Sequence, residues 1–442
     1  MVIVVATATL ARAELPIDRE PINYHTAPAT DPIARLQVRL DRGEIKLKHD
    51  DEGPGYLKSV LDALGVSATS QTLVFSKTSF QHTRIAPRTP RALYFGDDVY
   101  VGYVKAGDAL EFAAVDPKLG ATFYLLDQEP KRRPKFVRQA DACLQCHHSS
   151  KTQDVPGHLV RSVFPDEGGM PLFGAGSFVT DQASPLKERW GGWYVTGTHG
   201  AQRHMGNVVV ADRDHPERLD VEAGANRVDL KGLVDTWPYL TEYSDIVALM
   251  VIEHQTQLHN RITLAGYQAR LGRYYDEGLN KALNQPIDAV SASTQSRIKS
   301  YAEGLVKAML FVDEARLTAP VEGTSGFAAQ FTSRGPRDRR GRSLRDFDLK
   351  TRLFKYPCSY LIYSEAFDAL PKPTKDHVYL RLREVLTGQD TSRDFAHLGT
   401  DDRRAILEIL RETKIGLPDD WKATGSEGPK PKPFVDAARA GR

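Results

Sequence analysis

Five consecutive residues of this 442-residue chain, Cys143-Leu144-Gln145-Cys146-His147, carry its most specific chemistry. Two thiols at this spacing can each add to one of the two vinyl groups of a porphyrin, and the histidine that follows can reach the iron from one side. The motif therefore predicts covalent attachment of one haem c through Cys143 and Cys146, with His147 as an iron ligand.

Two other chemistries use a CxxC pair and stay open. A zinc knuckle needs a second pair of ligands, and the candidates are poor: Cys358 is the one cysteine left, and His148 is too close in sequence. A redox dithiol of the thioredoxin type belongs at a helix N-terminus in a βαβ unit, which the flanking sequence does not indicate. Without a disulfide partner inside the chain, Cys358 is expected to be a buried thiol.

The other side of the iron requires a second ligand, and residues 189–206 are the richest source of candidates. This stretch holds two of the four tryptophans, five glycines, two histidines and a methionine. Glycine lets a backbone approach a flat ligand, and a tryptophan such as Trp193 can wall a dry pocket. We therefore expect Trp193 to contact the cofactor.

If residues 193–199 and 204–211 pair as a hairpin, His199 and His204 become cross-strand neighbours with Cβ atoms about 5 Å apart. His204 is the preferred second iron ligand, followed by His199 and then Met205. Met170, in a glycine-rich loop, is a further possibility, and so is an iron without a second protein ligand.

The remaining histidines are weaker candidates. His254 and His259 fall on a predicted long helix, where a separation of five residues places them about 140° apart around the axis. They cannot readily hold one metal together, and each is expected to lie in the core or at an interface, with His254 the better candidate for the haem pocket as ligand or proton donor. His148 and His158 are expected at the surface.

Composition limits the classes of function. The chain is 41% hydrophobic and 26% charged with a formal charge of +2, which indicates a globular protein and gives no electrostatic case for binding nucleic acid. Residues 1–10 are apolar and precede Ala11-Arg12-Ala13, which predicts a signal peptide over 1–13, although the usual basic residues before the apolar run are missing. No stretch is long enough to span a membrane as a helix. The protein is therefore expected to be periplasmic or otherwise exported.

The hydrophobic pattern predicts an α+β protein. Short β-branched or aromatic runs separated by turn residues indicate an antiparallel meander over 73–75, 92–95, 99–104, 110–115 and 121–126, with further strands after the motif. Helical periodicity follows over 244–271, 294–317, 349–369, 375–386 and 401–413. The predicted organisation is a β-rich haem-binding region over 14–224, a helical region over 225–424 and a disordered tail over 425–442.

Through Cys143, Cys146 and His147 the chain resembles the c-type cytochromes. That resemblance implies thioether bonds to both cysteines, ligation of iron by His147 and maturation outside the cytoplasmic membrane. It covers only the motif and the export signal. Because strands surround the motif, the small helical cytochrome c fold is not expected, and the chain looks more like a large bacterial monohaem protein.

Two functional hypotheses follow. The first is electron transfer by a six-coordinate haem, held by His147 and His204, to or from a periplasmic redox partner protein. The second is a haem enzyme, as an oxidoreductase, or a module that binds a gas or peroxide at an open iron site. The size of the helical region motivates the second hypothesis, since it exceeds what carrying one electron requires.

Overall fold

The structure is a computed structural model that describes residues 15–131 and 133–421. The predicted signal peptide and the predicted tail from 425 onward lie outside the described residues. Within them, an antiparallel sheet of seven strands precedes most of the helices, so the chain has the expected α+β fold and not the small helical one.

The sheet has the strand order β6-β5-β4-β3-β2-β1-β9. Its strands are β1 (Thr72–Val74), β2 (Arg91–Phe95), β3 (Val99–Val104), β4 (Ala109–Asp116), β5 (Gly120–Asp127), β6 (Phe136–Gln139) and β9 (Trp193–Tyr194). All neighbours pair antiparallel, and β1 to β5 form the predicted meander. Two small two-stranded sheets join β7 (Arg161–Val163) to β8 (Ser177–Val179) and β10 (Gly197–Thr198) to β11 (Glu322–Gly323).

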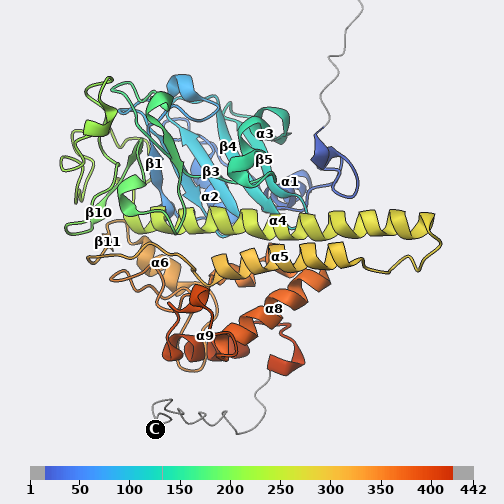
Figure 1. Ribbon diagram of the computed structural model, residues 1–442. Coiled ribbons are helices and arrows are strands. Elements are labelled where there is room, and N and C mark those ends of the chain that lie inside the picture. Colours follow the sequence, from blue (N-terminus) through green and yellow to red (C-terminus); the bar gives the residue numbers. More distant parts are fainter. Residues whose placement is uncertain (1–14, 132, 422–442) are drawn as a thin grey trace, which may run out of the picture.

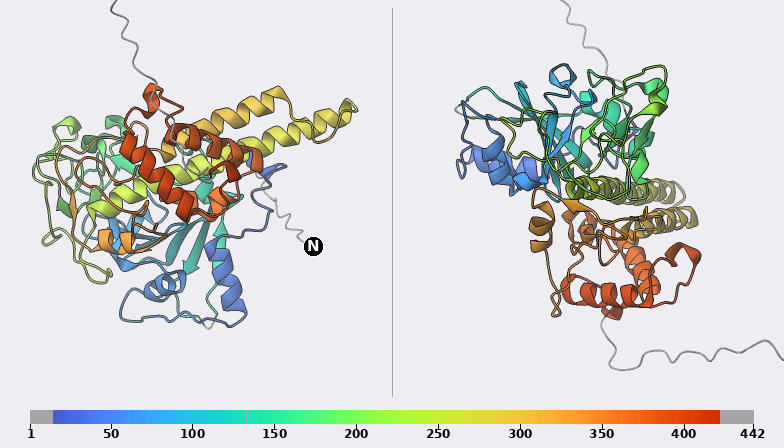
Figure 2. Two further views of the ribbon diagram at one scale, coloured as in Figure 1. Left: turned by 90° about the horizontal axis from the view of Figure 1, so that it is seen from below. Right: turned by 90° about the vertical axis from the view of Figure 1, so that its left-hand side faces the viewer.

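Nine α-helices fall within the described residues. They are α1 (Pro32–Asp41), α2 (Leu57–Leu64), α3 (Asp141–His147), α4 (Ile246–Ala282), α5 (Ala292–Met309), α6 (Phe327–Ser333), α7 (Glu365–Asp368), α8 (Lys372–Leu386) and α9 (Thr400–Thr413). Figure 1 shows α4 running beneath the sheet with α5 alongside it, and α8 and α9 on the far side of this pair. The α4–α5 hairpin projects beyond the body of the protein (Figure 2).

The two faces of the sheet enter different parts of the core because strand side chains alternate with a period of two. On one face, Ala92, Tyr94 and Val101 pack with α1 and α2. On the other face, Phe95 and Val115 pack with α4 and the helices beyond it. Figure 2 shows the sheet between these helical layers.

Helix α4 begins at Asp245, whose side chain accepts hydrogen bonds from the N–H groups of Val247 and Ala248. Residues 246–256 are all buried, because the sheet covers one side of the helix and α5 with the C-terminal helices covers the other. A helix that is buried all round needs a partner for every polar side chain that it carries.

Two sequence predictions are wrong in detail. Residues 349–369 are not one helix but mostly loops, with a 3₁₀-helix at Tyr360–Tyr363 and α7, because Pro357 interrupts the segment and Asp348 accepts from the N–H groups of residues 350–352. The hairpin expected from 193–199 and 204–211 does not form either. β9 pairs with β1 and β10 pairs with β11, while the amide of Asn207 takes up both the N–H and the C=O of Val195.

Among the described residues, no helix has the length and the apolar character that crossing a membrane requires.

Candidate functional site

The CxxCH motif forms helix α3, which follows β6 directly at the edge of the sheet. Cys143 and Cys146 are three residues apart, so both thiols lie on the same side of this helix. Between them Leu144 is buried in a small apolar cluster, against which Cys143 also packs, and this contact fixes the rotation of the helix. Both cysteines are free thiols, Cys146 exposed and Cys143 partly buried.

His147 is held by the loop that follows α3. Its Nδ1–H donates to the carbonyl oxygen of Gly157 at 2.8 Å, and its own carbonyl accepts from the N–H of Gly157 at 2.9 Å. The ring centroids of His147 and of Phe123 on β5 lie 4.8 Å apart. Burial lowers the pKa of His147, so the imidazole is neutral and its Nε2 lone pair is free to bind a metal.

A cavity of about 300 Å³ adjoins both thiols and His147. Its wall is largely one face of the sheet, because every second residue of β2 to β5 points into it: Leu93, Gly102, Ala113, Phe123 and Leu125. Trp193 and Ile252 of α4 close it on other sides. Small ligands and cofactors typically bind in apolar cavities of about 300–1,000 Å³ with a few polar groups in the wall.

One ion pair interrupts this apolar wall. Arg91 of β2 and Glu111 of β4 reach across β3 and lie 2.7 Å apart, and Gln81 donates to Glu111 at 2.9 Å. The guanidinium covers Gly102, where a Cβ would lie 2.6 Å from Nη2 of Arg91. Nε of Arg91 is buried without a hydrogen-bond partner among the described residues. The cavity therefore has one cationic group held in place and available to a bound molecule.

The sequence predictions for the second ligand receive no support from the cavity. Trp193 does line it, with its indole N–H donating to the carbonyl of Arg161 at 2.8 Å. His199 and His204 lie side by side with ring centroids 4.7 Å apart, but neither is among the lining residues. Both nitrogens of His199 are hydrogen-bonded, whereas Nε2 of His204 is buried without a partner in the described chain. Their role as ligands stays a prediction.

The outcomes for the other histidines differ. His254 and His259 are buried in the core, as expected, whereas His148, expected at the surface, is partly buried. His254 donates through Nδ1 to Gln182 and accepts through Nε2 from Ser359, so it is a satisfied core residue. His158 was expected at the surface, but it is 4% exposed and lines the cavity. The reason is Asn260 of α4, whose amide pairs with both the N–H and the C=O of His158.

Residues missed by the sequence reasoning are Arg91, Glu111, Tyr100 and His158. For three of them the sequence holds a recognisable signal. Arg91, Glu111 and Tyr100 point to the same face of the sheet as the apolar residues of the cavity wall. A charged side chain on the buried face of a strand, such as Glu111 within β4, indicates a partner or a bound group. His158 carries no comparable signal, because its burial depends on a helix a hundred positions later.

The structure gives less support to a zinc site or a redox dithiol at the CxxC pair. In the part of the chain that the structure describes, no group of three or more His, Cys, Asp or Glu side chains is placed to hold a metal ion. Burial, together with the nearby Glu111, raises the pKa of Cys143 to about 11, whereas a redox-active dithiol depends on a lowered thiol pKa.

Comparison with protein-family models, with curated protein sequences and with solved structures gives no match to this chain.

Proposed function

We propose that this chain is an exported haem protein that binds one haem c covalently through Cys143 and Cys146, with His147 as an iron ligand. The observation that carries the proposal is that both thiols and a neutral imidazole border the same largely apolar cavity. When bound, the haem supplies a one-electron redox centre. The chain positions it by the helix α3, by the His147–Gly157 hydrogen bond and by the sheet face opposite.

Among the functions open to such a protein, the cavity favours an iron with an open coordination position. Its described lining includes no methionine or lysine, and His158 is the one histidine besides His147. Gly157 lies against the Nδ1 edge of His147, and the iron binds at the other edge, at Nε2. Residue 158 follows Gly157, so His158 enters the cavity from the same segment that holds His147, and its Nε2 is buried without a hydrogen-bond partner among the described residues.

An open position would bind a small molecule such as a gas or peroxide, with Arg91 and Glu111 as polar groups in the cavity wall. Arg91 suits this role because its Nε has no partner among the described residues, while its Nη2 is anchored by Glu111. This arrangement supports a haem-dependent oxidoreductase or a ligand-binding module.

Electron transfer is the second candidate function. Cys146 is exposed, so a haem attached there has an edge near solvent, where a periplasmic redox partner protein can exchange electrons. A six-coordinate iron ligated by His204 requires that residue to enter the cavity, which it does not line in this structure.

The visible spectrum of the reduced protein, with and without carbon monoxide, distinguishes the two functions. We expect a high-spin spectrum that converts on addition of the gas, because neither His199 nor His204 lines the cavity and its described lining holds no methionine or lysine. His204→Ala is the matched control and should leave the spectrum unchanged. A sharp low-spin spectrum that does not respond to carbon monoxide, and that becomes high-spin in His204→Ala, would replace the open-site proposal with the electron-transfer one.

A further inference from the structure

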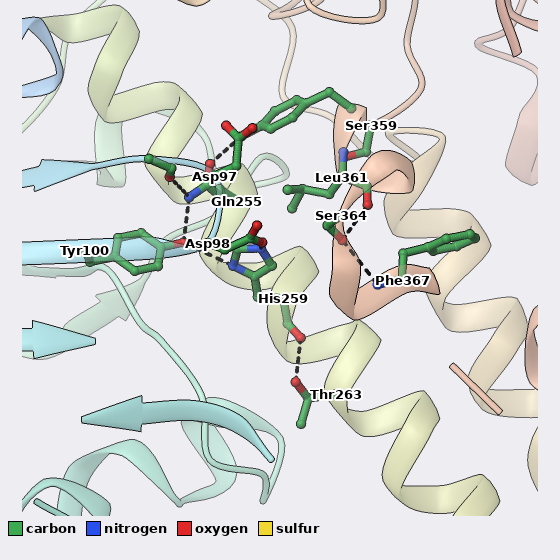
Figure 3. Close-up of polar contacts among 12 residues, drawn as sticks. Asp97, Asp98, Tyr100, Gln255, His259, Thr263, Ser359, Leu361, Ser364 and Phe367 are labelled. Carbon is green, nitrogen blue, oxygen red and sulfur yellow. Dashed lines mark hydrogen bonds and ion pairs between the residues drawn. The ribbon is translucent and has the colours of Figure 1, made fainter. Parts of the chain in front are cut away.

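A row of buried polar side chains connects the cavity to the protein surface. Tyr100 lines the cavity from β3, and its hydroxyl lies 3.2 Å from Nδ1 of His259 on α4. Nε2 of His259 lies 3.7 Å from Oδ1 of Asp98, which precedes β3. The side chain of Asp98 is 27% exposed and so reaches solvent. Figure 3 shows Tyr100, His259 and Asp98 close together between the strand and the helix.

The hydrogen-bond partners indicate which atoms in this row are donors. The amide nitrogen of Gln255 donates to the carbonyl of Gly96 at 2.8 Å and to the hydroxyl of Tyr100 at 2.9 Å, because the carbonyl can only accept. In the assignment that uses the hydroxyl as a donor, Tyr100 receives a hydrogen from Gln255 and donates its own to Nδ1 of His259. The neutral His259 then carries its proton on Nε2, directed at Asp98.

The last contact in this row, between His259 and Asp98, is not a hydrogen bond in this structure. A separation of 3.7 Å is too long for a hydrogen bond, and neither Nε2 of His259 nor Oδ1 of Asp98 has another partner within residues 15–131 and 133–421. Buried polar atoms without partners are costly, and in native proteins they mark places where an ion, a water molecule or a proton is handled. Here the two atoms face each other.

We propose that Asp98 and His259 form a redox-linked proton site for the cavity, coupled to it through Tyr100. The inference rests on the proposed haem function. One electron from a one-electron reductant converts iron(III) to iron(II), and one proton from solvent forms an O–H bond on the carboxylate of Asp98. The electron adds a negative charge in the cavity, which disfavours the negative charge of the Asp98 carboxylate nearby and so favours its protonation.

Burial, together with the neighbouring charges, places the pKa of Asp98 in the neutral range. Burial raises the pKa of Asp98 to about 7, with Asp97 and Glu365 adding to the rise and Arg35 and Arg345 opposing it. Asp97 itself is ion-paired with Arg334 and Arg345. The histidines around the site are His259, whose pKa burial lowers to about 3, and its neighbours His158 and His254, whose pKa values are also lowered. Asp98 is therefore the member of this set that changes charge near pH 7.

Redox titration of the purified holoprotein between pH 5 and 9 tests the proposal. In the wild type, the midpoint potential should fall with rising pH around neutrality, by up to about 59 mV per pH unit for one proton per electron. Asp98→Asn should remove this slope, and His259→Gln should shift the pH range in which it occurs. Asp108→Asn, an exposed carboxylate at the other end of β3, is the matched control and should keep the wild-type slope.

The outcomes separate the two proposals. A coloured protein whose potential is independent of pH, or whose slope persists unchanged in Asp98→Asn, overturns the redox-linked proton site and leaves the haem proposal standing. A colourless protein overturns the proposed function and this inference together. Loss of the slope in Asp98→Asn with an unchanged visible spectrum supports the site, because a purely structural role for Asp98 would not change a pH profile.

Discussion

Alanine at both Cys143 and Cys146 is expected to give a protein from which acidified acetone extracts all of the haem, whereas the wild type retains its pigment. The two thioether bonds are the covalent attachment in our proposal, and without them only His147 and the apolar cavity hold the porphyrin. The measurement is the absorbance that stays with the precipitated protein after extraction. Each single variant should keep its haem through one remaining bond, with a changed pyridine haemochrome spectrum because one vinyl group is intact.

The matched control is Cys358→Ala, which removes the third cysteine of the chain. Cys358 is fully buried in the main core, away from the cavity lining, so its loss should leave haem attachment intact. If the wild-type pigment is itself extracted, the attachment is not covalent. If the double variant keeps its pigment, attachment does not involve these cysteines.

Local sequence features predicted the sheet well. The meander of β1 to β5 could be found because each strand alternates or is β-branched, and turn residues separate the strands. The long helix α4 was also predicted, with its start at Asp245 close to the expected position. These elements depend on interactions within a few residues, which are visible in a linear sequence.

The cavity could be predicted only in part, because residues far apart in the chain assemble it. The motif identified His147 and the two thiols, and the tryptophan-rich stretch identified Trp193. The side chains from the sheet, by contrast, meet α3 only because β2 to β6 lie next to one another in this order. No local pattern shows that Ile252, on a helix more than a hundred positions after the motif, closes the same space.

The prediction of the second ligand depends on the same kind of long-range assembly. His199 and His204 were expected to face the haem because they belong to a glycine- and tryptophan-rich segment. In the structure, β9 is added to the sheet beside β1, so the segment that follows it leads away from the cavity lining. The two histidine rings do meet, as expected, and the ring of His204 packs against Trp190, which does not line the cavity.

Arg189→Met is expected to lower the free energy of unfolding by about 3–5 kcal/mol, the usual cost of removing one partner of a buried ion pair. Arg189 donates to Glu253 of α4 at 2.9 Å and to the carbonyls of Gln182 and Ser184, so it ties the segment before Trp190 to the long helix. Glu253 is fully buried, and without the arginine its charge has no cation beside it. Chemical denaturation followed by circular dichroism measures the loss.

The size of this effect should depend on pH. Burial raises the pKa of Glu253 to about 7, while Arg189 opposes the rise, so in Arg189→Met the pKa rises further. Below pH 7 the carboxyl of the variant is protonated in the folded state, and the cost is small. Above pH 7 the wild type holds a paired carboxylate, whereas the variant must take up a proton or bury an unpaired charge on folding, so the difference between the two proteins grows. The variant's own stability falls as pH rises from about 4.5, the unfolded pKa of glutamate, through its raised folded pKa.

A double variant, Arg189→Met with Glu253→Leu, provides the control. Replacing a buried ion pair with apolar side chains of similar size is often neutral or stabilising, so the double variant should recover most of the lost stability and lose its dependence on pH. Lys187→Met, a surface change in the same segment, should stay within about 0.5 kcal/mol of the wild type. An Arg189→Met protein as stable as the wild type at pH 8 would mean that the pair does not hold the segment to α4.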